Sequence, residues 1–184
     1  VLFRSGVVVH DGDLITFTTA EDIIGTAKKV FMKYQNFPND VNPGERILLD
    51  DGKLIFEIIE TDKKSEVIAR VIQGGELKSK KGVNLPNTKI SLPAMTEKDI
   101  ADAIFAIEQK VDWIALSFVK TPQDLQQLQE LIAEHSDCKI PIIAKIEMPE
   151  ALENIDKIVA YCDGLMVARG DLGVELPAHE VPLV

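Results

Sequence analysis

The order of hydrophobic and polar residues divides the chain into two parts with different predicted structures. Residues 1–88 contain short apolar and β-branched runs, separated by turn sequences such as Asp-Gly and Asn-Pro-Gly. Such runs predict strands, and their spacing of about ten residues favours a small barrel or sandwich. The clearest pair, 46–50 and 54–61, flanks an Asp-Asp-Gly-Lys turn and predicts a β-hairpin.

From about residue 89 the hydrophobic pattern takes on a helical period. Segment 96–109 repeats apolar residues at the spacing of one helix face, and Thr96 with Asp99 matches a capping box. The expected elements after it are a strand at 111–118, a helix from Thr121-Pro122, a strand at 139–147, a single helix from Pro149 to Val159, and a strand at 163–168.

This alternation of helices and strands predicts parallel strands joined by right-handed crossovers. Three strands in about ninety residues is the pace of a (β/α)₈ barrel, and a doubly wound sheet shows the same alternation. Periodicity therefore predicts an α/β fold for residues 89–184 and leaves these two architectures open.

Charged residues follow two consecutive predicted strands. Lys145 and Glu147 are two positions apart, so their side chains are expected on one side of the strand. Arg169, Gly170 and Asp171 follow the next strand. Because the carboxyl ends of parallel strands meet at one edge of the sheet, and functional loops gather there, we expect these residues to form a site.

The residue types at this edge are suited to binding a small anion together with a metal ion. Glu147 and Asp171 offer hard oxygen ligands for Mg²⁺ or Mn²⁺, and Lys145 supplies a positive charge for oxygens that gain charge in a transition state. Gly170 lets the backbone approach a ligand closely. The alternatives are an exposed Lys-x-Glu salt bridge that contributes little to stability and a loop tripeptide without a role.

Composition narrows the range of partners. The chain has 184 residues and a net charge of −10, which disfavours binding to nucleic acid or to an anionic membrane. Its two cysteines have no metal-site or redox spacing, and no segment matches a signal peptide or membrane span. We expect a soluble cytoplasmic protein in which Trp113 and the phenylalanines fill the cores.

Several longer motifs resemble the pyruvate kinase family. They are "ILLDDG", "GGELKSKKGVNLP", "LPAMTEKDI", "KIE" and "DGLMVARGDLGVELP", in the order that the family has them and over nearly the whole chain. The resemblance implies a partial (β/α)₈ TIM barrel, residues 89–184, with an inserted small all-β barrel domain, residues 1–88, that acts as a lid. It also implies phosphoryl transfer from phosphoenolpyruvate to ADP in glycolysis, giving pyruvate and ATP.

The resemblance assigns roles to particular residues. Glu147 and Asp171 correspond to the ligands of Mg²⁺ or Mn²⁺, and Lys145 to the catalytic residue that stabilises the transition state. Gly170 and Asp171 correspond to residues that bind the substrate, and Lys81 to a contact with the nucleotide. Composition alone does not separate Lys81 from its neighbouring lysines. Ser117 follows a strand of the same sheet, where its hydroxyl could orient Lys145 or cap the strand.

The resemblance also implies parts that these residues do not supply. The K⁺ ligands and a phosphate-binding arginine are expected outside the chain, and the full-length protein is expected to form a homo-oligomer, a tetramer. We therefore expect a fragment that is inactive alone and prone to association, because an open barrel exposes strand edges. A second reading of the site is a Mg²⁺-dependent aldolase or lyase acting on pyruvate-like acids.

Overall fold

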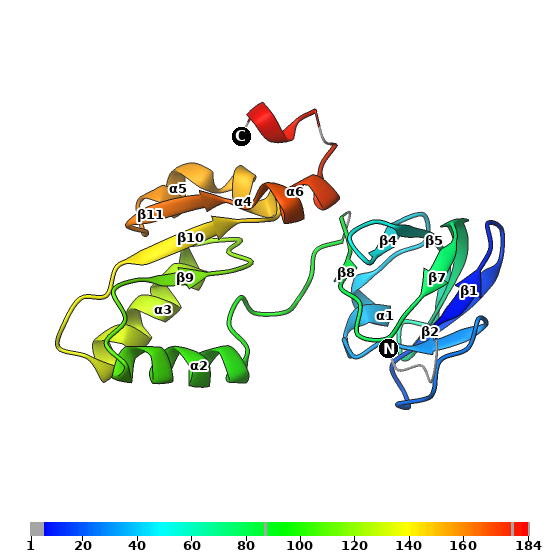
Figure 1. Ribbon diagram of the computed structural model, residues 1–184, viewed down its shortest axis with the longest axis horizontal. Coiled ribbons are helices and arrows are strands. Elements are labelled where there is room, and N and C mark those ends of the chain that lie inside the picture. The colour runs from blue at the N-terminus through cyan, green and yellow to red at the C-terminus, as the bar shows by residue number, and fades with distance from the viewer. Residues whose placement is uncertain (1–5, 87, 178, 184) are drawn as a thin grey trace. The chain divides into compact units, whose positions relative to one another are not determined.

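The computed structural model describes residues 6–86, 88–177 and 179–183 (Figure 1). The chain divides into two compact units, Val1–Ser91 and Leu92–Val184. On one side of this boundary, the backbone N–H of Ser91 donates to Oδ2 of Asp40 at 2.9 Å and to the hydroxyl of Tyr34 at 3.2 Å. On the other side, Nζ of Lys120 donates to the carbonyl of Leu92 at 2.7 Å. Each flank of the boundary is therefore held within its own unit.

The first unit consists mainly of strands. A six-stranded sheet has the order β3-β2-β6-β5-β4-β8, with β2 and β3 parallel and the other neighbours antiparallel, and β1 pairs with β7 in a separate antiparallel sheet. A short helix, α1, was not predicted. The elements are β1 Val7–Val9, β2 Leu14–Thr18, β3 Lys29–Phe31, α1 Phe37–Asp40, β4 Arg46–Leu49, β5 Leu54–Thr61, β6 Glu66–Gln73, β7 Gly75–Leu77 and β8 Val83–Asn84.

The predicted hairpin is present between β4 and β5. Leu49 pairs with Leu54 across a four-residue turn. Within this turn Asp50, Asp51 and Gly52 have φ values of 53°, 57° and 79°. Aspartate and glycine tolerate this left-handed conformation better than most residues do, so the Asp-Asp-Gly sequence explains where the chain reverses.

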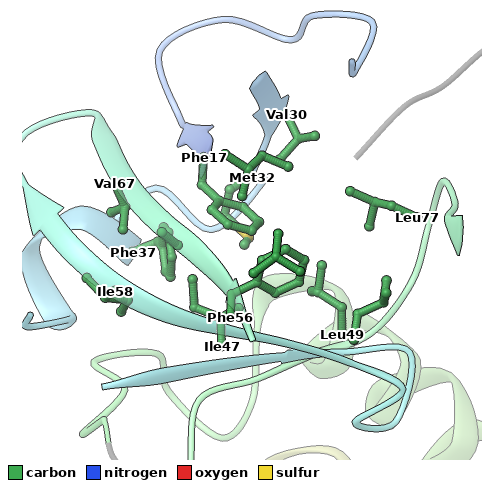
Figure 2. Close-up of a cluster of buried hydrophobic side chains, with 14 of the residues drawn as sticks. Phe17, Val30, Met32, Phe37, Ile47, Leu49, Phe56, Ile58, Val67 and Leu77 are labelled. Atoms are coloured by element: carbon green, nitrogen blue, oxygen red, sulfur yellow. The ribbon is translucent and has the colours of Figure 1, made fainter. Parts of the chain in front are cut away.

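Alternating residues of these strands bury a continuous core (Figure 2). Phe17, Phe37 and Phe56 are fully buried. The ring of Phe17 makes edge-to-face contacts with the other two, at centroid distances of 6.0 Å and 5.4 Å. Aromatic contacts of this geometry stabilise a core beyond the area they bury.

The second unit contains a three-stranded parallel sheet in the order β11-β10-β9 (Figure 1). This parallel sheet, with helices between its strands, makes the chain an α/β protein, as predicted. The elements are α2 Glu97–Glu108, β9 Ile114–Leu116, α3 Pro122–His135, β10 Ile142–Ile146, α4 Pro149–Glu153, α5 Ile155–Val159, β11 Gly164–Val167, α6 Arg169–Glu175 and the 3₁₀ turn η1 Val181–Leu183.

Helices α2 and α3 begin where the sequence predicts. Thr96 caps α2, and its hydroxyl and backbone N–H exchange hydrogen bonds with Asp99 in a capping box. Helix α3 begins at Pro122, and its apolar stripe of Leu125, Leu128 and Ile132 is buried against the sheet residues of the same core.

The single helix predicted from Pro149 is wrong, because the structure has α4 and α5 with a break at Asn154. The side-chain amide of Asn154 donates to the carbonyl of Glu150 at 3.1 Å, in the place of the backbone N–H that would continue the helix. It also donates to the carbonyl of Lys120 at 3.1 Å. An asparagine side chain that competes with the backbone in this way favours a helix end.

The prediction that Trp113 and the phenylalanines fill the cores is confirmed for Phe17, Phe37 and Phe56 and is wrong for three residues of the second unit. Trp113, Phe105 and Phe118 are 51%, 62% and 52% exposed in the second unit. Apolar composition does not show on which side of a short element a ring lies. Among the described residues, no helix is both long and apolar enough to cross a membrane.

Candidate active site

The carboxyl end of β10 positions Lys145 and Glu147. The strand alternates as predicted, with Ala144 and Ile146 fully buried in the core, while Lys145 is partly exposed. Nζ of Lys145 lies 2.5 Å from Oε1 of Glu147, so the two side chains are on the same side of the strand. Their ion pair is not the exposed salt bridge of the alternative reading, because the side chain of Glu147 is only 1% exposed.

Both carboxylate oxygens of Glu147 have partners. Oε1 contacts the ammonium group of Lys145, and Oε2 accepts a hydrogen bond of 2.9 Å from the backbone N–H of Phe118. A buried carboxylate requires such partners, because removal from water is unfavourable for a charge without compensation. The orientation of this carboxylate is therefore fixed from two neighbouring strand ends, β9 and β10.

Phe118 contributes its backbone rather than its ring. The residue has φ of +55°, although it is not glycine, and half of its side chain is exposed. A left-handed conformation is unfavourable for a bulky residue and persists where the surroundings require it. Here it accompanies the N–H that donates to Glu147. Phe118 was not predicted as a site residue, since a backbone amide has no signature in the sequence.

Ser117 lies beside Lys145. This agrees with the predicted alternative in which its hydroxyl orients Lys145. Nζ of Lys145 donates to Oγ of Ser117 at 2.8 Å. The ammonium group is thus held between a hydroxyl at the end of β9 and a carboxylate at the end of β10. Ser117 and Phe118 are consecutive, so one short segment contacts both charged residues.

Arg169, Gly170 and Asp171 lie in the first turn of α6 rather than in a loop. The preceding residue, Ala168, donates its N–H to the carbonyl of Ile146 at 3.1 Å, which extends the pairing of β10 and β11 by one step. The helix therefore begins directly after the position that neighbours the end of β10. Gly170 has open space where a β-carbon would be, so its backbone can be approached closely.

The carboxylates at this edge suit a magnesium ion chemically. Mg²⁺ usually takes one or two carboxylates and completes its shell with water and substrate oxygens. Glu147 offers a buried and oriented carboxylate, and Asp171 a second one from α6. Within the part of the chain that the structure describes, no cluster of three or more His, Cys, Asp and Glu side chains is suited to a metal ion.

Lys81 belongs to the first unit and differs there from its neighbours. Its Nζ lies 2.9 Å from Oδ1 of Asp50, in the turn between β4 and β5, whereas Lys78 pairs with Glu76. The hydrogen bond from Lys81, aided by the charge of Lys53, lowers the pKa of the Asp50 carboxyl below its usual range. Lys81 is thus held by the acidic turn between β4 and β5, and its role in binding a nucleotide stays a prediction.

By its fold the chain is an α/β protein, and its candidate site lies at the carboxyl ends of parallel strands. The family model "Pyruvate kinase, barrel domain" matches residues 3–184. The chain therefore belongs to the pyruvate kinase family.

Curated relatives support the assignment to this family. Proteins named pyruvate kinase from Bacillus licheniformis, Geobacillus stearothermophilus and Clostridium perfringens are 50%, 46% and 43% identical over 89%, 98% and 99% of this chain. The chain spans 28%, 31% and 38% of the length of these three relatives. The matched region thus corresponds to about a third of a full-length pyruvate kinase.

Proposed function

We propose that this chain is part of a pyruvate kinase that transfers the phosphoryl group of phosphoenolpyruvate to ADP. In this reaction the bond between phosphorus and the enol oxygen breaks, a bond to the terminal phosphate of ADP forms, and protonation of the enolate gives pyruvate. The observation that carries the proposal is the buried Glu147, oriented by Lys145 and by the N–H of Phe118 at the carboxyl ends of parallel strands. The family membership supports it.

The side chains have distinct roles in this proposal. Glu147 and Asp171 hold Mg²⁺ or Mn²⁺, which neutralises charge on the transferring phosphoryl group when it is bound. Lys145 directs its ammonium group towards the oxygens that gain charge, and Ser117 fixes its direction through the 2.8 Å hydrogen bond. The backbone N–H groups of Gly170 and Asp171 bind the substrate carboxylate, and Lys81 contacts the nucleotide. Phosphoryl transfer depends on this kind of positioning and charge neutralisation rather than on a covalent nucleophile.

We extend the proposal to the organisation of the full-length protein. Residues 89–184 form part of a (β/α)₈ barrel, and residues 1–88 an inserted small β-barrel lid domain. The protein acts in glycolysis in the cytoplasm as a homotetramer and uses K⁺, whose ligands other segments provide. The 184 residues alone are inactive because these segments are required.

The test uses a full-length enzyme in which this chain replaces the matching segment of the Geobacillus stearothermophilus relative. ATP formation from phosphoenolpyruvate and ADP is measured with Mg²⁺ and K⁺. We expect Lys145→Met to lower kcat by about a hundredfold or more, as loss of a group that stabilises transition-state charge does in other enzymes. Glu147→Gln should raise the Mg²⁺ concentration that half-maximal activity requires.

Lys139→Met is the matched control. Lys139 precedes β10 at its opposite end, where it pairs with Asp163 and is 77% exposed. The substitution removes the same charge from the same segment, and we expect kcat within about twofold of the parent, as for most surface changes. Equal kcat for Lys145→Met and Lys139→Met would reject the role of Lys145. ATP formation by the 184-residue chain alone would reject its proposed inactivity.

A further inference from the structure

We propose that the ammonium group of Lys145 and a divalent cation are alternative partners of Oε1 of Glu147, and that Ser117 retains Lys145 when the cation takes its place. The inference rests on the proposed function, because it takes Glu147 as a metal ligand. It adds that Lys145 opposes binding of the cation until an anionic substrate arrives.

The first step concerns the orientation of the Glu147 carboxylate. Oε2 accepts the 2.9 Å hydrogen bond from Phe118, whose backbone is held at φ of +55°. With 1% of the Glu147 side chain exposed, water has little access to replace this bond if the carboxylate rotates. The carboxylate therefore keeps its orientation, and Oε1 remains the oxygen that faces Lys145.

The positive charge of Lys145 already contacts Oε1 of Glu147. Nζ of Lys145 lies 2.5 Å from this oxygen. A divalent cation at the same oxygen would lie within a few ångströms of the ammonium charge, and repulsion between like charges is strong at a site so poorly exposed to water. The cation can bind tightly only if Nζ withdraws from Oε1.

Ser117 offers the ammonium group of Lys145 a second partner. Oγ of Ser117 lies 2.8 Å from Nζ and comes from the end of β9, the strand next to β10. It accepts a hydrogen bond from Nζ that does not involve Oε1. The long lysine side chain, 25% exposed here, can turn about this contact. Ser117 is thus a positioning residue that lowers the penalty for releasing Glu147.

The exchange couples the cation to the substrate. An anionic group near Lys145 offers the ammonium a partner that replaces Glu147, so it strengthens binding of the cation. By linkage, the cation strengthens binding of the anion by the same factor. The Lys145–Glu147 pair would therefore favour joint binding of cation and substrate over binding of the cation alone.

The test measures the affinity for Mn²⁺ without substrate, by electron paramagnetic resonance of free Mn²⁺, in the 184-residue chain and in the full-length chimera. We expect Lys145→Met to bind Mn²⁺ about tenfold more tightly, within the range typical of coupling between two ligands. Ser117→Ala should bind it about threefold more weakly, because the ammonium then remains on Glu147, and Ser117→Thr should restore the parent affinity.

Opposite shifts for Lys145→Met and Ser117→Ala separate the exchange from general damage to the site, which would weaken binding in both. Lys139→Met reports the effect of removing one positive charge elsewhere on the segment. Unchanged binding in Lys145→Met, or a tightening no larger than that of Lys139→Met, would overturn the exchange while leaving the metal site intact. Weaker binding in Lys145→Met would also overturn the exchange. Parent affinity in Glu147→Gln would instead remove Glu147 from the metal site, and the proposed function would lose this ligand as well.

Lys145→Met leaves a buried carboxylate without its ion pair and could therefore destabilise the 184-residue chain. In that case the measurement in the full-length chimera decides the test. Phosphoenolpyruvate added to the chimera gives a second readout. The substrate should tighten Mn²⁺ binding in the parent, and the factor should shrink in Lys145→Met. An equal factor in both proteins would contradict the proposed link between Lys145 and the anion.

Discussion

The two units of the chain use their strands differently. In Val1–Ser91, a six-stranded and a two-stranded sheet surround a core in which three phenyl rings are fully buried. In Leu92–Val184, helices pack against a three-stranded sheet whose edge strand β11 leaves Leu165, Met166 and Val167 41–44% exposed. The first unit therefore buries its aromatic core, although scattered apolar residues such as Leu14, 57% exposed, remain at its surface. The second unit instead leaves three consecutive apolar residues exposed on one edge strand, and it carries the candidate site.

The largest expected effect tests the independence of the first unit. Phe56→Ala removes a ring that is fully buried and lies 5.4 Å from that of Phe17. We expect it to lower the free energy of unfolding of this unit by about 3–5 kcal/mol, because it leaves a cavity. Circular dichroism of the strands during urea unfolding measures this change.

The only tryptophan, Trp113, lies in the second unit, so its fluorescence reports unfolding there. Phe56→Ala should leave the fluorescence transition in place, and a joint shift of both transitions would break the comparison between the units. The control Phe105→Ala truncates a ring that is 62% exposed on α2. It should change stability by less than about 0.5 kcal/mol.

The second prediction concerns the exposed edge. Leu165→Lys places a charge on β11, and we expect it to weaken self-association of the 184-residue chain by about 1 kcal/mol, or about fivefold. Sedimentation velocity over a range of concentrations measures this. Val159→Lys, on α5, changes a residue of similar exposure, 49%, away from the strand edge. Equal effects of both substitutions would mean that the edge has no special part in association.

The smallest expected effect concerns a turn within the first unit that is held by its own hydrogen bonds. Asp62, between β5 and β6, accepts hydrogen bonds from the backbone N–H groups of Glu66, Lys64 and Ser65. These bonds, that from Glu66 foremost, lower the pKa of the Asp62 carboxyl from 3.8 to about 2. Because the folded-state pKa is the lower one, the stabilisation is complete above about pH 4 and is lost as the pH falls towards 2.

Asp62→Asn should therefore be less stable than the parent at pH 6, and the difference should shrink between pH 4 and pH 2. Urea unfolding at a series of pH values, followed by circular dichroism, measures this difference. A difference that stays constant across this range would show that the charge of Asp62 does not stabilise the turn.

Much of the fold could be predicted from local sequence signals. The turn after Leu49, the capping box at Thr96 and the proline that begins α3 each act through short-range contacts, and the structure has all three. The break at Asn154 could not be predicted from the apolar stripe. It depends on a side-chain amide that bonds to a carbonyl of its own segment and to Lys120, and the second contact exists only in the folded chain.

The candidate site, like the fold, could be predicted from the sequence only in part. The spacing of Lys145 and Glu147 was sufficient to predict that they share one side of a strand, and the resemblance to the family singled out both residues. The burial of Glu147 and the hydrogen bond from Phe118 depend on how neighbouring strands are arranged, which spacing does not reveal. Whether Asp171 and Lys81 act with them stays a prediction that the substitutions above address.

The hydrogen bonds around Ser91 have a practical consequence for separating the two units genetically. Residues 89–91 follow the last strand of the first unit, and a gene divided after codon 88 would give a product without Ser91. That product would lose the amide that donates to Asp40 and the hydroxyl that contacts Tyr34 and Asn36. A division after codon 91 keeps these bonds, and it leaves the carbonyl of Leu92 with Lys120 in the other polypeptide.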